Sequence, residues 1–168
     1  MKYKNLIVLG LDPGYSRIGY GVLKKQNGKI IYLTSGVFSF PPSPHLGKKL
    51  LALEKKLKKI IIAYHPLVVG VEKLFYFQNK KTIIGVAEAR GIILKTLAEH
   101  KLQVVEMTPQ HIKNSLTGDG KASKEGVAKM VKSFLNLNQR KMLDDETDAL
   151  AIAISTFNQV LTLQKYLL

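Results

Sequence analysis

Short apolar runs separated by turn-forming residues dominate the first quarter of the chain. Residues 6–11 are almost wholly apolar and end at an Asp-Pro-Gly turn over residues 12–14, which is typical of a buried strand. Residues 17–25 and 29–38 have the pattern of two further strands, and the Asn-Gly pair between them favours a hairpin turn. The pattern therefore predicts three consecutive strands.

A helical stripe follows the prolines at positions 41, 42 and 44. Apolar residues recur there in alternating steps of four and three, the spacing of one helix face: Leu46, Leu50, Leu53, Leu57, Ile60 and Tyr64. Lysines fill many of the other positions, and we interpret them first as a solvated face and second as a DNA contact. The pattern predicts a helix over residues 46–64.

Strands and helices alternate in the remainder of the chain. Residues 67–71 are nearly all apolar, which predicts a central parallel strand, and residues 102–105 form another strand. Helices are predicted over residues 80–99, from a capping pair at 108–109, over 123–135 and over 143–161. This order predicts an α/β fold in one domain spanning residues 1–168: a five-stranded mixed sheet flanked by helices on both faces.

The chain is strongly basic, with 26 Lys and Arg against 12 Asp and Glu and a net charge of +14. This excess favours a nucleic-acid partner, and a merely soluble lysine-rich surface is the alternative. The absence of cysteine excludes disulfides and thiolate metal sites and fits a cytoplasmic location. No apolar run approaches the roughly 20 residues of a membrane helix, so no membrane partner is expected.

Four acidic residues stand out at the ends of predicted elements. Asp12 and Glu72 each end an apolar run, and each follows a glycine two residues earlier that leaves space on its face of the strand. If the two strands are parallel neighbours, the carboxylates lie about 5 Å apart at the edge where α/β sheets form active sites. Asp145 and Asp148 share one face at the start of the last predicted helix. Asp145 has an alternative interpretation as an ordinary acidic residue at a helix N-terminus.

Carboxylates gathered in one place repel one another, and a divalent cation removes that repulsion. Ligands that are all oxygen favour Mg²⁺, with Mn²⁺ as a substitute, over zinc. Two such ions would bracket a scissile phosphate and activate water. The sequence contains no phosphate-binding P-loop, no cysteine nucleophile and no nucleophile-elbow motif, so no competing chemistry is indicated.

Several blocks of the sequence resemble the RuvC family of Holliday-junction resolvases. The blocks occur in the family's order and cover nearly the whole chain: residues 9–14, 19–22, 71–75, 89–91 and 145–153. The resemblance implies an RNase H-like fold, a homodimer and Mg²⁺-dependent cleavage of four-way DNA junctions by paired symmetric nicks. It also implies a role in homologous recombination and DNA repair, with a branch-migration helicase as a partner.

The resemblance also implies roles for individual residues. It makes Asp12, Glu72, Asp145 and Asp148 the catalytic metal ligands; some members have histidine at the position of Asp145. The family's aromatic residue at the crossover corresponds to Phe75, although Tyr76 and Phe77 follow it and core packing is an alternative role. The DNA-binding lysines correspond to Lys113 and Lys124, with Lys121 nearby, and solvated helix ends are the alternative.

Three other functions remain open from the residues. The same fold could cut RNA–DNA hybrids or other branched DNA. The Asp-Pro-Gly turn also resembles the phosphate loop of sugar kinases and actin-like ATPases, but those proteins need two such domains and this chain has room for one. A catalytically silent DNA-binding module would keep the basic surface and would not need all four acids.

Overall fold

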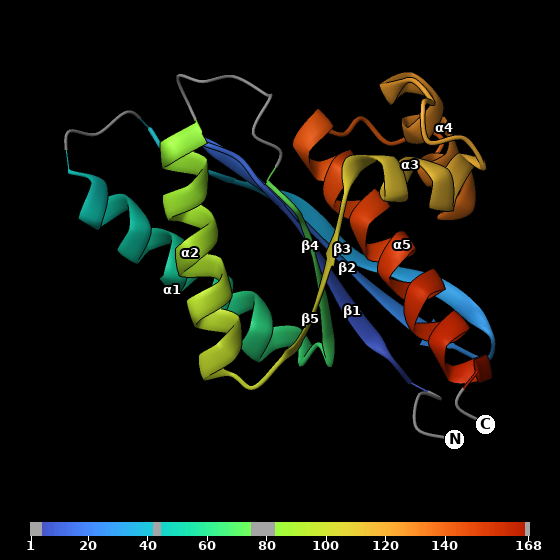
Figure 1. The fold of residues 1–168 in the computed structure, drawn as a ribbon, viewed down its shortest axis with the longest axis horizontal. Helices are drawn as coiled ribbons and strands as arrows, with labels where there is room; N and C mark the ends of the chain where they lie inside the picture. Colours follow the sequence, from blue (N-terminus) through green and yellow to red (C-terminus); the bar gives the residue numbers. More distant parts are fainter. Residues whose placement is uncertain (1–4, 42–44, 75–82, 167–168) are drawn as a thin grey trace.

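The computed structural model describes residues 5–41, 45–74 and 83–166, with side chains up to residue 162. Figure 1 shows how its strands and helices are arranged. In chain order they are β1 (Ile7–Pro13), β2 (Arg17–Gln26), β3 (Lys29–Ser39), α1 (Leu46–Tyr64), β4 (Val68–Glu72), α2 (Ile83–Glu99), β5 (Gln103–Met107), α3 (Pro109–Thr117), α4 (Lys124–Phe134) and α5 (Asp144–Tyr166). The predicted order of elements is confirmed. The last helix extends further than predicted, to Tyr166. Among the described residues, no helix is long and apolar enough to cross a membrane.

The five strands form one mixed sheet in the order β3-β2-β1-β4-β5. The first three strands pair antiparallel through two hairpins, whereas β1, β4 and β5 run parallel. The prediction that the strands before Asp12 and Glu72 are parallel neighbours is therefore confirmed. Their register pairs Leu11 with Val71, so the two acidic residues follow at the same edge of the sheet.

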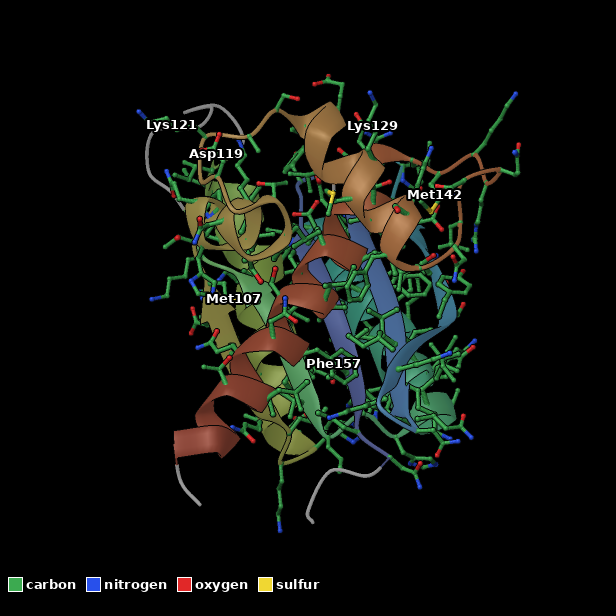
Figure 2. The ribbon with its side chains drawn as sticks, turned by 90° about the vertical axis from the view of Figure 1, so that its right-hand side faces the viewer. Met107, Asp119, Lys121, Lys129, Met142 and Phe157 are labelled. Carbon is green, nitrogen blue, oxygen red and sulfur yellow. The ribbon has the colours of Figure 1, made fainter. Side chains whose placement is uncertain are left out.

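Helices cover both faces of this sheet, as predicted (Figure 1). The side chains of β1 alternate between two apolar cores. Leu9 and Leu11 belong to the core under α1 and α2, whereas Val8 belongs to the core under α3, α4 and α5. Figure 2 shows Phe157 of α5, which is fully buried in the core under α3, α4 and α5. Because Asp12 follows Val8 by four residues, it faces α5.

Glycines let α5 lie directly on the sheet. Gly21, Gly10 and Gly70 stand opposite one another on β2, β1 and β4. A Cβ atom at Gly10 would lie 2.1 Å from the Ala149 carbonyl oxygen, and one at Gly19 would lie 1.8 Å from the Asp145 carbonyl oxygen. The space that we expected beneath the strand-end carboxylates is thus occupied by the backbone of α5.

We expect Gly10→Ala to destabilise the protein by about 2 kcal/mol or more, because the added methyl group forces α5 away from the sheet. Urea unfolding would measure the change. Gly47→Ala is the matched control, since nothing lies within 4 Å of a Cβ atom there and alanine favours the helix by about 0.5–1 kcal/mol. Equal effects of the two substitutions would show that α5 does not need this close approach.

Candidate active site

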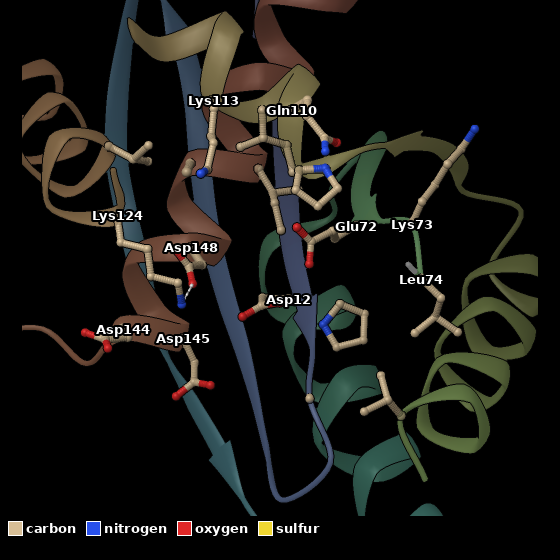
Figure 3. A pocket seen from close by; sticks show the side chains of 18 of the residues that line it. Asp12, Glu72, Lys73, Leu74, Gln110, Lys113, Lys124, Asp144, Asp145 and Asp148 are labelled. Carbon is tan, nitrogen blue, oxygen red and sulfur yellow. Dashed lines mark ion pairs between the residues drawn. The ribbon is translucent and has the colours of Figure 1, made fainter. Parts of the chain in front are cut away.

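The four acidic residues line one pocket of about 800 Å³ (Figure 3). It opens at the edge of the sheet where β1 and β4 end and α5 begins. Asp12 lies near the end of β1, Glu72 is the last residue of β4, and Asp145 and Asp148 lie in the first turns of α5. Three separate segments of the chain therefore bring carboxylates to one cavity.

Burial and mutual repulsion make three of these carboxylates hard to ionise, namely Asp12, Glu72 and Asp148. Burial raises the pKa of Asp12 well above its ordinary value, and the nearby charges of Glu72, Asp148 and Asp145 raise it further. Burial, then the charge of Asp148, raises the pKa of Glu72 to about 7. Burial also raises the pKa of Asp148, even though Lys124 opposes the shift. A cation in this pocket would relieve the repulsion that the shifts express.

Two basic side chains already pair with the acids of α5. Lys124 Nζ lies 3.6 Å from Asp148 Oδ2, and Arg17 Nε lies 3.0 Å from Asp145 Oδ2. The pKa of Lys124 is raised, chiefly by the charge of Asp148. The contact with Arg17 does not satisfy its partner, because Asp145 Oδ2 is buried and has no hydrogen bond in the described part of the chain.

The donor set of the pocket fits Mg²⁺ or Mn²⁺. Its acidic side chains offer only oxygen atoms to a cation, and Asp145 Oδ2 is a buried oxygen without a hydrogen bond among the described residues. Within the described residues, however, no three Asp, Glu, His or Cys side chains are already arranged to hold an ion. The acids of α5 point toward Arg17 and Lys124 instead, so binding a metal requires side-chain rotations within the pocket.

The predicted DNA-binding residues are divided by the structure. Lys113 of α3 and Lys124 of α4 line the same pocket as the carboxylates. Lys121 is not among the lining residues; its backbone N–H donates to Asp119 Oδ1 at 2.8 Å in the turn between α3 and α4. Figure 2 shows this turn at the outside of the molecule. Phe75, Tyr76 and Phe77 lie outside the described residues.

The pocket also contains residues that the sequence did not single out. Tyr15 reaches it from the connection between β1 and β2, and Arg17 reaches it from the start of β2. Lys73 follows Glu72, and Gln110 comes from α3. Arg17 was predicted only as the start of a strand, and its position beside the Asp-Pro-Gly turn was the one available signal. Tyr15 is half-exposed, with Lys49 Nζ 4.1 Å above its ring.

Hydrogen bonds around the buried Glu146 fasten the first turn of α5 to β3. Glu146 Oε1 accepts hydrogen bonds from Ser35 Oγ at 2.6 Å and from Arg140 at 2.9 Å. Arg140 also donates to the Tyr32 hydroxyl. Glu146 lies between Asp145 and Asp148, so this contact restrains the helix turn that carries both pocket acids. Sequence reasoning missed it because the partner Ser35 is 111 residues away.

Comparison with known proteins identifies the family. Residues 8–156 match the family described as Crossover junction endodeoxyribonuclease RuvC. The chain belongs to the RuvC family. A relative of the same description from Thermosipho melanesiensis is 40% identical over 146 residues, which cover 87% of this chain and 93% of the relative. The RuvC family consists of endodeoxyribonucleases, so the predictions of family and enzyme class are confirmed.

Solved structures agree with this assignment. RuvC from Thermus thermophilus superposes with a TM-score of 0.84 at 28% identity, covering 94% of this chain and 97% of that one. The same protein in complex with a Holliday junction substrate gives a TM-score of 0.81 at 26% identity, covering 93% and 96%. The RNase H-like fold class predicted from the resemblance is confirmed.

Proposed function

We propose that the protein is a Mg²⁺-dependent endonuclease that resolves four-way DNA junctions by paired symmetric nicks. The observation that carries the proposal is the convergence of four carboxylates, from β1, β4 and α5, in one pocket of a strongly basic protein. Membership of the RuvC family and similarity to a RuvC structure containing a Holliday junction support the choice of substrate. Homologous recombination and DNA repair are the processes that use such an activity.

In this proposal Asp12, Glu72, Asp145 and Asp148 hold the metal. Bound Mg²⁺, for which Mn²⁺ can substitute, supplies charge stabilisation at the scissile phosphate and a more acidic water. The protein would hold these ligands in position. The parallel register of β1 and β4 places Asp12 and Glu72, and the close packing of α5 on the glycines of the sheet places Asp145 and Asp148.

The remaining proposed roles concern the DNA. Lys113 and Lys124 would bind phosphates inside the pocket, and Lys121 would bind the backbone of the same DNA outside it. Phe75 would stack on a base at the crossover, with Tyr76 and Phe77 as neighbouring candidates.

The assembly that we propose is a homodimer, because two active sites related by a twofold axis match the twofold symmetry of the junction. Of the small residues on α2, Ala89 is buried in the protomer's own core, whereas Gly91 has open space around it and could admit a second copy. A branch-migration helicase would deliver the junction, and the site of action would be the cytoplasm.

A cleavage assay tests the proposed function. The purified protein is incubated with a synthetic four-way junction, a duplex of the same sequence and an RNA–DNA hybrid, each with Mg²⁺ or with EDTA. We expect Mg²⁺-dependent nicks at symmetric positions in two strands of the junction alone. Equal cleavage of the duplex or the hybrid would contradict the assignment, as would junction cleavage that persists in EDTA.

Lys113 lines the pocket and Lys121 does not, so we expect substitutions at the two positions to affect different steps. Lys113→Ala should lower the cleavage rate at saturating protein by about tenfold or more, because Lys113 lies in the pocket where charge develops on the phosphate. Lys121→Ala should weaken junction binding at low salt and leave that saturated rate within about twofold, since Lys121 would contact the DNA outside the pocket. Single-turnover cleavage and gel-shift titration separate rate from binding. Equal rate losses in both variants would contradict the distinction.

A further inference from the structure

Arg17 brings a permanent positive charge to a carboxylate that we assign to the metal. It is the first residue of β2, and its Nε lies 3.0 Å from Asp145 Oδ2 inside the pocket. The side chain of Arg17 is 53% exposed, whereas that of Asp145 is 20% exposed. The guanidinium therefore reaches inward from the mouth of the pocket to a largely covered acid.

The contact between Arg17 and Asp145 has a geometry that a divalent cation could replace. Arginine and carboxylate bind one another best through two parallel hydrogen bonds, which fix both groups. Here a single nitrogen approaches a single oxygen, and that buried oxygen receives no hydrogen bond within the described residues. Charge alone holds the two groups together, so a divalent cation that binds Asp145 Oδ2 directly can displace the guanidinium.

The displaced guanidinium would have a second anion within reach. Half of the Arg17 side chain faces solvent at the pocket mouth, where the proposed DNA strand must enter. A planar guanidinium binds a phosphate through two hydrogen bonds, which a more strongly hydrated lysine cannot match. Arg17 thus has a partner before the metal binds and another after it binds.

We propose that Arg17 exchanges between two anions: it neutralises Asp145 when the metal is absent, and it binds a phosphate of the DNA strand once the metal has taken Asp145. This inference rests on the proposed function. It makes Arg17 a substrate-binding residue that also competes with the metal. If Arg17 instead held Asp145 in a fixed position for the metal, removing Arg17 would weaken metal binding. The competition proposed here predicts that removing Arg17 strengthens it.

Metal binding without DNA is the first test. Isothermal titration with Mn²⁺ compares the wild-type protein, Arg17→Ala and Lys25→Ala, which removes a charge from the other end of β2. We expect Arg17→Ala to bind Mn²⁺ about three- to tenfold more tightly and Lys25→Ala to stay within twofold. Unchanged or weaker binding by Arg17→Ala overturns the competition.

The same substitution in an Asp145→Asn background shows whether the effect passes through this pair. We expect Arg17→Ala to leave the Mn²⁺ affinity of that background unchanged, because the competing partner is already gone. If Arg17→Ala raised the Mn²⁺ affinity equally in both backgrounds, the effect would come from the overall charge of the protein. That result would overturn the proposed exchange of Arg17 between Asp145 and DNA. Circular dichroism verifies that each variant is folded.

Junction binding is the second test. Gel shifts in Ca²⁺, which binds carboxylates in place of Mg²⁺, are measured over a range of salt after a denaturing gel has verified that the junction is intact. Arg17→Ala should bind more weakly, with a salt slope reduced by about one. An unchanged affinity and slope would overturn the phosphate contact. Failure of the wild-type protein to cleave junctions would instead refute the proposed function, and it leaves the Mn²⁺ result interpretable.

Discussion

Asp12→Asn should lower junction cleavage by at least about a hundredfold and leave junction binding within about twofold. The charges of all three other acids act on Asp12, and Figure 3 shows it between Glu72 and the acids of α5, so we expect it at the centre of the proposed metal site. Asparagine keeps the shape of the side chain and loses the charge that holds a divalent ion. In our proposal, junction binding depends instead on the lysines and the arginine that line the pocket. Single-turnover cleavage and gel shifts measure the two quantities on one preparation.

The same substitution should raise the stability of the metal-free protein at pH 8. Burial and three neighbouring carboxylates raise the pKa of Asp12, so its ionised form costs free energy in the folded state. A neutral amide removes that cost. Glu88→Gln on α2, which does not line the pocket, is the matched control. A loss of stability in urea unfolding would mean that Asp12 is a structural partner, and a loss of junction binding would mean that it contacts DNA directly.

The metal-free protein should become less stable as the pH rises from about 4.5 to about 7. The pKa of Glu72 is raised in the folded state to about 7 from 4.5, so between these values the folded protein binds a proton that the unfolded chain has lost. The contribution of Glu72 to stability is therefore fully present below this window and is lost as the pH rises through it. Since one pKa unit corresponds to about 1.4 kcal/mol, the Glu72 shift alone represents about 3 kcal/mol.

Urea unfolding in EDTA at several pH values checks this prediction. Glu72→Gln should flatten the decline relative to wild type, because the variant has no proton to lose at that position. Saturating Mg²⁺ should flatten it in the wild-type protein, since the metal binds and stabilises the ionised carboxylates. If wild type and Glu72→Gln decline in parallel, the pKa of Glu72 is not raised in the folded protein.

The strand-end half of the site could be predicted from the sequence because local rules are sufficient there. Residues 6–11 and 67–71 are apolar runs of strand length, and each leads directly into an acid. Parallel pairing of these strands then brings Asp12 and Glu72 to one edge of the sheet, as the register of Leu11 and Val71 shows. The last helix was predictable for a similar reason, since an apolar run follows Asp148 at once.

Contacts between distant segments could not be predicted in this way. Ser35 and Glu146 are 111 residues apart, and no sequence pattern near either residue predicts the buried hydrogen bond between them. Arg17 and Asp145 meet only because the Asp145 backbone packs against Gly19, two residues after Arg17. Lys121 was predicted to bind DNA because it lies near Lys113 and Lys124 in sequence, yet it does not line the pocket that those two lysines line.

Locating bound Mn²⁺ by anomalous X-ray scattering from crystals of the protein tests the central claim most directly. The claim is that carboxylates from β1, β4 and α5 hold a divalent ion in one pocket. We expect an anomalous peak within ligand distance of Asp12 and of at least one carboxylate among Glu72, Asp145 and Asp148. A protein saturated with Mn²⁺ whose anomalous peaks all lie outside this pocket would contradict the account.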